Sequence, residues 1–434
     1  MKEIQLPVGA QAHQDAEKRA ARDFQRHEQG HGRRQALAVL ALFGWRQAGA
    51  AFGHVPPSHY PLWRRAHSIA PRFDGSRADG LQSGRIPAGI SGGAGVDAKV
   101  TKRSLGNLTQ EEVKSVVDDY VGLHDAGVER KKERYRQLVN QYYDLVTDFY
   151  EWGWGKSFHF APRRRSESFK ASQIRHQHFL ADKLSLKPGM QVLDVGCGVG
   201  GPMGNLARHC GASFVGINNN AYQIERAKVH TRDVEALCRF IKSDYMQIPR
   251  SDDHYDGAIS IEAMPHAPDK TAAYAEIFRV LRPGAGFACY EWCLTDAFDP
   301  SNAEHRQIKE GIMTGSALPD IAGTTEVCEA VRAAGFELIE SLDLAGESDP
   351  ETPWYRALQG RDFSLASIPR TPLGRVLTNL ILRVAEPLRL APQGAREVST
   401  FLNWGADTLV EGGRTGIFTP MFYFLARKPL PRGN

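Results

Sequence analysis

Residues Gln191–Gly201 read QVLDVGCGVGG, and this stretch decides the expected fold. Its first five residues form a short, mainly apolar run, as in a strand buried on both faces of a parallel sheet. The glycines that follow permit a tight turn from strand to helix and let the backbone approach a ligand without interference from Cβ atoms. The candidate ligand-binding residues here are Asp194, Gly196, Gly198 and Gly200.

Short apolar runs alternate with helical stretches after this segment, which is typical of a parallel sheet with crossover helices. Helices are expected over Ser168–Leu184 and Val327–Gly335. The predicted strands are Gln191–Val195, Ser213–Ile217, Arg239–Ser243, Tyr255–Ile261, Gly286–Tyr290, Phe336–Leu342 and Met421–Ala426. We therefore predict an α/β fold with a Rossmann-like, doubly wound sheet.

The polar residues around the glycines indicate which ligand binds, because the glycines alone also satisfy the dinucleotide-binding pattern. A carboxylate at Asp194 would repel a pyrophosphate but can meet the cationic methionine portion of a sulfonium ligand. The second strand is followed by asparagines rather than by the lone acid that holds an NAD ribose. Amides of Asn218, Asn219 and Gln223 can bond ribose hydroxyls, and Asp244 can meet an adenine amino group. The sequence thus predicts S-adenosylmethionine as the cofactor.

Composition narrows the choice of partners. The 434 residues include 54 Lys and Arg against 50 Asp and Glu, whereas nucleic acid binding needs clustered cations, so we expect no nucleic acid partner. Six cysteines show no paired metal-ligand spacing, which predicts no metal site and a reducing compartment. No run approaches the ~18 apolar residues that cross a bilayer.

The regions outside the sheet are expected to be helical or irregular. Residues 1–104 lack sustained periodicity, which predicts a disordered extension, either for targeting or dispensable. Thr109 can cap a first helix, a second is expected over Arg130–Tyr150, and an aromatic loop, YEWGWGKSFHF, over Tyr150–Phe160. The expected domains are a helical and aromatic cap that contacts the substrate (105–165), a cofactor-binding core (166–298) and a C-terminal region (299–434).

The insertion between the last two predicted strands, residues 343–418, is far longer than a hairpin loop and is expected to be helical. Apolar residues repeat at helical spacing from Leu373 to Leu388, with Arg375, Arg383 and Arg389 interspersed. Two interpretations remain open. The helix either faces the protein core or lies on a membrane surface.

Several of these stretches resemble the sterol 24-C-methyltransferases over about Leu105–Pro429. The markers are YYDLVTDFYEWGWGKSFHF (142–160), DVGCGVGGP (194–202), GINNNAYQI (216–224), YEWCLTD (290–296) and GGRTGIFTPMFYFLARKP (412–429). The resemblance implies a methyltransferase sheet and methylation of the Δ24 double bond of a sterol side chain, in sterol biosynthesis. It also implies a side-chain carbocation that rearranges by hydride shift and loses a proton.

That chemistry needs π faces near the developing charge and one base in a dry pocket. The expected catalytic residues are Glu262, His266, Tyr150, Trp152 and Glu291, with Asp148 and Glu151 as further candidate bases. The expected substrate-binding residues are Tyr150, Glu151, Trp152, Trp154, Phe158, Tyr290 and Trp292. Within IEAMPHAP (261–268), Met264 and Pro265 replace the family's Thr and Cys, which puts rate or product choice in question.

The expected partners are a sterol of the cycloartenol, lanosterol or zymosterol type and a membrane surface, bound peripherally, at the cytosolic face of the endoplasmic reticulum or a lipid droplet. A homo-oligomer is a further expectation. Two alternatives remain: a methyltransferase for another small hydrophobic acceptor, such as a tocopherol precursor, and a non-catalytic sterol-binding homologue.

Overall fold

The computed structural model describes residues 108, 112–124, 127–361, 365–388 and 390–431. Expectations for residues 1–104 and for a cap at Thr109 lie outside these residues. Seven strands form one sheet: β1 (Gln191–Val195), β2 (Ser213–Asn218), β3 (Cys238–Lys242), β4 (Tyr255–Ile261), β5 (Leu281–Leu294), β6 (Glu337–Asp343) and β7 (Phe418–Arg427). Every predicted strand is present, and β5 is longer at both ends than expected.

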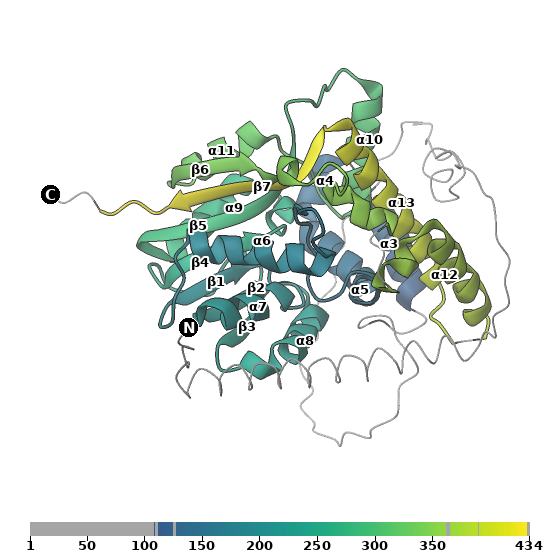
Figure 1. The fold of residues 1–434 in the computed structure, drawn as a ribbon, viewed down its shortest axis with the longest axis horizontal. Coiled ribbons are helices and arrows are strands. Elements are labelled where there is room, and N and C mark those ends of the chain that lie inside the picture. Colours follow the sequence, from purple (N-terminus) through teal and green to yellow (C-terminus); the bar gives the residue numbers. More distant parts are fainter. Residues whose placement is uncertain (1–107, 109–111, 125–126, 362–364, 389, 432–434) are drawn as a thin grey trace, which may run out of the picture. The chain divides into compact units, whose positions relative to one another are not determined.

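The strand order is β3-β2-β1-β4-β5-β7-β6 (Figure 1). Strands β1 to β5 are parallel, with Val192 of β1 opposite Phe214 of β2 and Gly257 of β4. β7 lies between β5 and β6 and is antiparallel to both. The expected α/β Rossmann-like fold is confirmed, and the order reverses direction beside β1, where open α/β sheets bind ligands.

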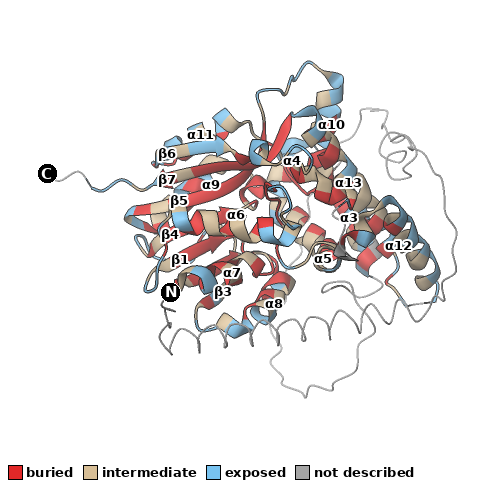
Figure 2. Cartoon of the chain, in the orientation of Figure 1, coloured by how far each residue is buried: buried red, intermediate tan, exposed pale blue. Residues whose placement is uncertain are grey.

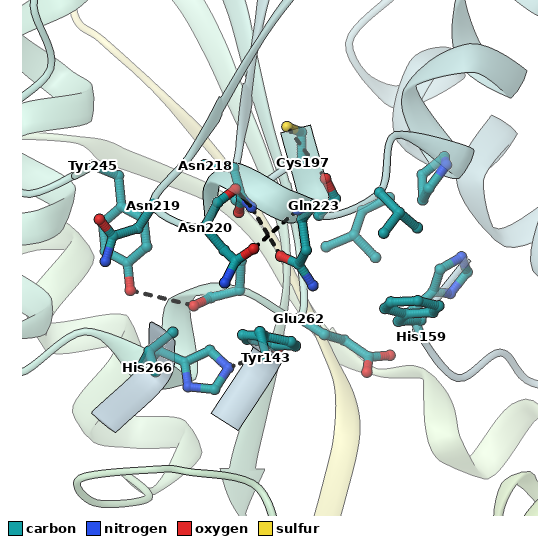
Figure 3. Close-up of a pocket in the computed structure, with 18 of the residues that line it drawn as sticks. Tyr143, His159, Cys197, Asn218, Asn219, Asn220, Gln223, Tyr245, Glu262 and His266 are labelled. Carbon is teal, nitrogen blue, oxygen red and sulfur yellow. Dashed lines mark hydrogen bonds between the residues drawn. The ribbon is translucent and has the colours of Figure 1, made fainter. Parts of the chain in front are cut away.

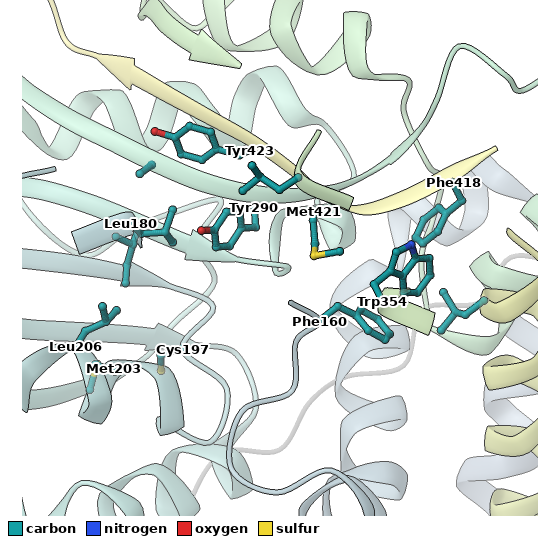
Figure 4. Close-up of a cluster of buried hydrophobic side chains, with 14 of the residues drawn as sticks. Phe160, Leu180, Cys197, Met203, Leu206, Tyr290, Trp354, Phe418, Met421 and Tyr423 are labelled. Atoms are coloured by element: carbon teal, nitrogen blue, oxygen red, sulfur yellow. The ribbon is translucent and has the colours of Figure 1, made fainter. Parts of the chain in front are cut away.

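Helices cover both faces of the sheet, as the doubly wound topology requires. These helices are α6 (Phe169–Lys183), α7 (Gly201–Cys210), α8 (Ala221–His230), α9 (Lys270–Val280) and α11 (Thr324–Ala333). Alternate strand residues enter two cores: Val192 packs with Leu180 and Leu206 of α6 and α7, whereas Leu193 packs with Tyr274 of α9. Figure 2 shows the buried parts of the strands in red, and Figure 4 shows the first of these cores, with Leu180 and Leu206.

A second layer of helices joins segments that are far apart in the sequence. It contains α3 (Glu112–His124), α4 (Val128–Glu133), α5 (Tyr135–Gly153), α10 (Ala303–Gly315), α12 (Pro372–Ala385) and α13 (Ala395–Thr415). Val113 of α3, Leu138 of α5 and Val398 of α13 share one apolar cluster. Short 3-10 turns complete the insertion: η4 (Leu344–Glu347), η5 (Trp354–Gln359) and η6 (Leu365–Arg370). None of the helices in the described part of the chain is long and apolar enough to cross a membrane.

Two expectations about helices are corrected. The predicted helix 130–150 is divided at Arg134 into α4 and α5, and α5 continues to Gly153. Tyr150 and Trp152 therefore lie in the last helical turn rather than in a loop, since the backbone bonds of the helix continue past them. Helix α10 has no counterpart among the predicted elements.

Candidate active site

One pocket lies at the carboxyl ends of β1, β2, β3 and β4 (Figure 3). Its floor is the glycine loop and the residues after β2 and β4, and α5 and the segment Lys156–His159 complete the wall. Of the predicted cofactor residues, the lining includes Gly196, Gly198, Asn218, Asn219, Gln223 and Asp244. The strand ends therefore bring together residues that are distant in sequence.

The glycine loop needs backbone conformations that other residues rarely adopt. Gly196 and Gly198 have φ values of +77° and +52°. A Cβ on Gly196 would lie 2.2 Å from the Cβ of Ala263, whereas one on Gly198 would meet no atom within 4 Å. Gly200 begins α7 against Ala227 and is outside the pocket lining. The open space beside Gly198 thus lets a ligand approach the backbone of the loop closely.

Amide and carboxylate groups gather at the β2 and β3 side of the pocket. Asn218 donates its side-chain N–H to Oε1 of Gln223 at 2.8 Å, and Asn220 accepts from the Gln223 backbone at 2.9 Å (Figure 3). Asp244 accepts from Tyr135, Arg136 and the Met246 backbone N–H. These groups match the ribose hydroxyls and adenine amino group of a nucleoside.

Asp194 lies at 3% exposure on β1, next to the glycine loop but outside the pocket lining. Burial raises the pKa of this carboxyl to about 7. Burial, and after it the nearby Asp194 charge, raises the pKa of the Cys197 thiol, which lines the pocket. A buried acid in this position favours a cationic ligand, because an opposite charge would restore the ionised form.

Glu262 follows β4 and turns its carboxylate into the site with a left-handed backbone, φ +55°. Oε1 accepts the Phe160 backbone N–H at 2.7 Å, and Oε2 accepts the Trp292 indole N–H at 2.8 Å. Burial raises the pKa of Glu262 to about 8, and these two donors oppose the rise. Glu262 is therefore a carboxyl group with a high proton affinity, and its two hydrogen bonds hold it in a fixed orientation.

His266 shares the pocket with Tyr143 of α5 (Figure 3). Its Nδ1 lies 3.2 Å from the Ala317 carbonyl oxygen and its Nε2 lies 3.1 Å from the Tyr143 hydroxyl. The carbonyl can only accept, so Nδ1 carries the hydrogen and the Tyr143 hydroxyl donates to Nε2. Burial lowers the pKa of His266 to about 4, which keeps the ring neutral.

The structure accommodates Met264 and Pro265 without displacing His266. They form the 3-10 turn η3 (Met264–His266), in which Ala267 donates to the Met264 carbonyl at 2.9 Å. Pro265 stands near the start of the turn, where a backbone N–H has no partner within the turn. The departure from the family pattern therefore leaves the histidine in the pocket.

The aromatic segment divides into residues that face the pocket and residues that do not. Phe158 lines the pocket. The Tyr150 ring packs edge-on against the Phe158 ring, with centroids 5.3 Å apart. Trp154 packs against Phe160 and donates its indole N–H to the His159 carbonyl at 3.3 Å. Trp152 is 54% exposed and outside the lining, so its ring does not face the pocket.

Other predicted residues have partners elsewhere. Glu151 forms an ion pair with Arg226 and a hydrogen bond with His230, both of α8. Glu291 is fully buried and binds Lys270 and the Tyr274 hydroxyl, on the far face of the sheet from Tyr290. These carboxylates are outside the pocket lining and are not placed to act as bases there.

Three further predicted residues lie outside the pocket lining, two of them in the apolar core beside it. Tyr290 stacks on His176 with ring centroids 3.7 Å apart, in the cluster of Figure 4. Trp292 contacts the site through its bond to Glu262. Asp148 accepts the Tyr222 hydroxyl at the α5–α8 contact.

Sequence reasoning missed several lining residues. Tyr135, Val139 and Tyr143 lie on one face of α5, and their spacing of four could have indicated a shared face. Lys156 and Tyr245 carry no comparable signal, whereas Asn220 belongs to the run of asparagines after β2. Among the described residues, no group of three or more His, Cys, Asp or Glu side chains is arranged to hold a metal.

Comparisons with known proteins agree with this geometry. Residues 130–362 match the family described as mycolic acid cyclopropane synthetase, and residues 365–430 match the sterol methyltransferase C-terminal family. The cyclopropane synthase MmaA2 from Mycobacterium tuberculosis is 19% identical, with a TM-score of 0.51, covering 67% of this chain and 97% of that chain. The fold and the pocket define an S-adenosylmethionine-dependent methyltransferase.

The sequence relatives are closer. Cycloartenol-C-24-methyltransferase 1 of Oryza sativa subsp. japonica is 49% identical over 75% of this chain and 95% of its own length. The sterol 24-C-methyltransferase of Yarrowia lipolytica is 44% identical over 71% of this chain and 83% of its own length. The chain belongs to the sterol 24-C-methyltransferase family.

Proposed function

We propose that this enzyme methylates C24 of a sterol whose side chain carries a Δ24 double bond, with S-adenosylmethionine as donor. The observation that carries the proposal is the arrangement of one pocket in which amides and Asp244 lie at one side and Glu262, His266 and Tyr143 at the other. Relatives named for sterol and cycloartenol C-24 methylation support the substrate class.

The residues present fit the cofactor. Asn218, Gln223 and Asp244 offer acceptors and donors to the nucleoside, and the open space beside Gly198 admits the methionine portion. When bound, S-adenosylmethionine supplies an electrophilic methyl group and a positive charge. The chain has to align the alkene with that group and exclude water.

We propose Glu262 as the acceptor of the proton that the methylated side chain loses. With a pKa of about 8 it is a far stronger base than His266, whose pKa is about 4. A positive charge in the pocket favours the ionised carboxylate. Glu262 would therefore be ionised when the cofactor is bound, and the bonds from Phe160 and Trp292 fix its direction.

Tyr143 and Phe158 are proposed to stabilise the transient positive charge. Both rings line the pocket, and aromatic faces attract a cation without reacting with it. His266 accepts the Tyr143 hydroxyl hydrogen, which directs the phenol oxygen and orients the ring. The test is incubation of purified protein with labelled S-adenosylmethionine and a panel of sterols, followed by product identification. Absence of any C24-alkylated sterol would overturn the proposal.

We also propose that the enzyme acts as a peripheral protein at the cytosolic face of the endoplasmic reticulum or at a lipid droplet. The support is chemical: a sterol is nearly insoluble in water and resides in lipid. Cell fractionation with organelle markers tests the location, and recovery of the enzyme away from both compartments would contradict it. A homo-oligomer stays a prediction, to be measured by light scattering.

A further inference from the structure

Helix α12 exposes a row of apolar side chains and turns Arg375 toward the protein. Leu373 and Val376 of the helix are 71% and 65% exposed, and Leu388, in the turn after the helix, is 62% exposed. Leu380 and Val384, which continue the same stripe, are 53% and 55% exposed. The pattern is the reverse of a core-facing helix, in which such residues are buried. The interpretation of this stretch as a helix that faces the protein core is therefore wrong.

The inner side of α12 is firmly attached. Arg375 donates to the Leu358 carbonyl and to Asp407 of α13, both at 2.7 Å. Thr371 caps the helix by accepting the Gly374 N–H at 2.9 Å, and Gly374 lies against the Ile368 carbonyl. The exposed stripe thus belongs to a fixed helix, seen at the outer edge of the helical layer in Figure 2.

The charge on this helix is positive. Pro372–Ala385 contains Arg375 and Arg383 but no acidic residue. Arg383 is exposed, and no described side chain is ion-paired with it. A second copy of the chain would bring a second Arg383 to this face, whereas anionic lipid headgroups supply the opposite charge.

We propose that the face formed by Leu373, Val376, Leu380, Val384 and Leu388 is the surface that docks on a lipid bilayer, with Arg383 among the headgroups. This proposal rests on the proposed function, since a sterol substrate resides in lipid. An apolar helical stripe with flanking cations is the pattern of a helix that lies in a membrane interface.

The docking helix is connected to the wall of the pocket. Arg370, two residues before α12, donates to the Gly153 carbonyl at 2.6 Å, and its guanidinium lies 5.2 Å from the Trp154 ring centroid. Trp154 in turn bonds the carbonyl of His159, which lines the pocket. The contacts of Arg370 and Trp154 therefore connect the proposed docking helix to the aromatic segment at the active site.

The experiment measures sedimentation of the full chain with phosphatidylcholine vesicles, with and without phosphatidylserine. A triple variant, Val376→Ser, Leu380→Ser and Val384→Ser, changes only exposed side chains, and we expect its partition coefficient to fall roughly tenfold or more. The matched control is Ile339→Ser, Leu342→Ser and Leu430→Ser, which changes exposed apolar residues elsewhere and should bind like wild type. The single variant Arg383→Glu should weaken binding only to vesicles that contain phosphatidylserine.

Activity separates this proposal from the proposed function. With sterol delivered by cyclodextrin the triple variant should match wild type, whereas with sterol embedded in vesicles it should be slower. Undiminished vesicle binding by both the triple variant and Arg383→Glu would overturn the docking surface. So would a wild-type dimer that becomes monomeric in the triple variant while vesicle binding is kept. Failure of wild type to methylate sterol in either form would instead refute the proposed function.

Discussion

The indole N–H of Trp292 donates to Oε2 of Glu262 at 2.8 Å, across the neighbouring ends of β5 and β4. The bond opposes the rise in pKa that burial causes, and with the Phe160 N–H it holds both carboxylate oxygens. A residue predicted to bind substrate thus acts on the proposed base. Trp292 also packs edge-on against Phe418, so its ring has a structural role that a substitution has to preserve.

The variant Trp292→Phe keeps an aromatic ring and removes the N–H donor. Loss of a donor to the carboxylate favours the protonated form, so the pKa of Glu262 should rise. Because a base acts when ionised, the rising limb of kcat against pH should move to higher pH, with cofactor affinity retained. An unchanged pH profile would argue that Glu262 is not the base.

The variant Glu262→Gln tests the raised pKa through stability. A folded-state pKa of about 8, above the unfolded value, means that the folded protein holds a proton that the unfolded chain releases. Wild type therefore loses this contribution as pH rises from the unfolded pKa to the folded one. The stability of the Gln variant relative to wild type should increase by up to about 1.4 kcal/mol per pH unit across that window. Denaturant titrations across that window give the slope, and a flat difference contradicts the pKa.

A pair of ring variants tests which aromatic residues stabilise positive charge. Phe158→Leu removes a ring that lines the pocket, so turnover should fall roughly tenfold, or products of early deprotonation should accumulate. Trp152→Leu changes a ring that is 54% exposed and should leave turnover and products unchanged. Product analysis by mass spectrometry decides, and a larger defect in Trp152→Leu would reverse the assignment.

The variant Asp194→Asn tests the buried acid beneath the glycine loop. Its pKa of about 7 indicates that the ionised form is costly without a cation, so a positively charged ligand should bind with release of a proton. Calorimetry in buffers of different ionisation enthalpy should detect this release in wild type. The Asn variant should bind S-adenosylmethionine at least about tenfold more weakly, with no loss of melting temperature. Wild-type affinity would remove Asp194 from the cofactor site.

The variant Tyr143→Phe keeps the ring but removes the hydroxyl that donates a hydrogen bond to His266. If the hydroxyl orients the ring, turnover should fall several-fold while sterol affinity is retained, and His266→Phe should show the same defect. Combining the two changes should then cost little more than either alone, because both remove one interaction. Additive effects would assign the two residues separate roles.

Much of the fold could be predicted because its signals are local. Short apolar runs that alternate with helical stretches indicated the strands, so β1 to β7 were located to within a few residues. The glycines after β1 marked the turn in which positive φ values are needed. The run from Asp194 to Gly198 and the polar residues after β2 and β3 likewise follow from strand ends meeting at one edge of a parallel sheet.

Tertiary packing decided which faces are exposed, because helical spacing defines a stripe without saying what covers it. The apolar stripe of α12 is outward because Arg375 and Gly374 contact the protein. Trp152 is exposed because α5 continues past Tyr150 and a helix turns neighbouring side chains in different directions. Tyr143 reaches His266 only because α5 packs over the end of β4, a contact between residues 123 positions apart. The sequence by itself determined the strands and the cofactor loop, while burial and side-chain direction depended on long-range contacts that no local pattern encodes.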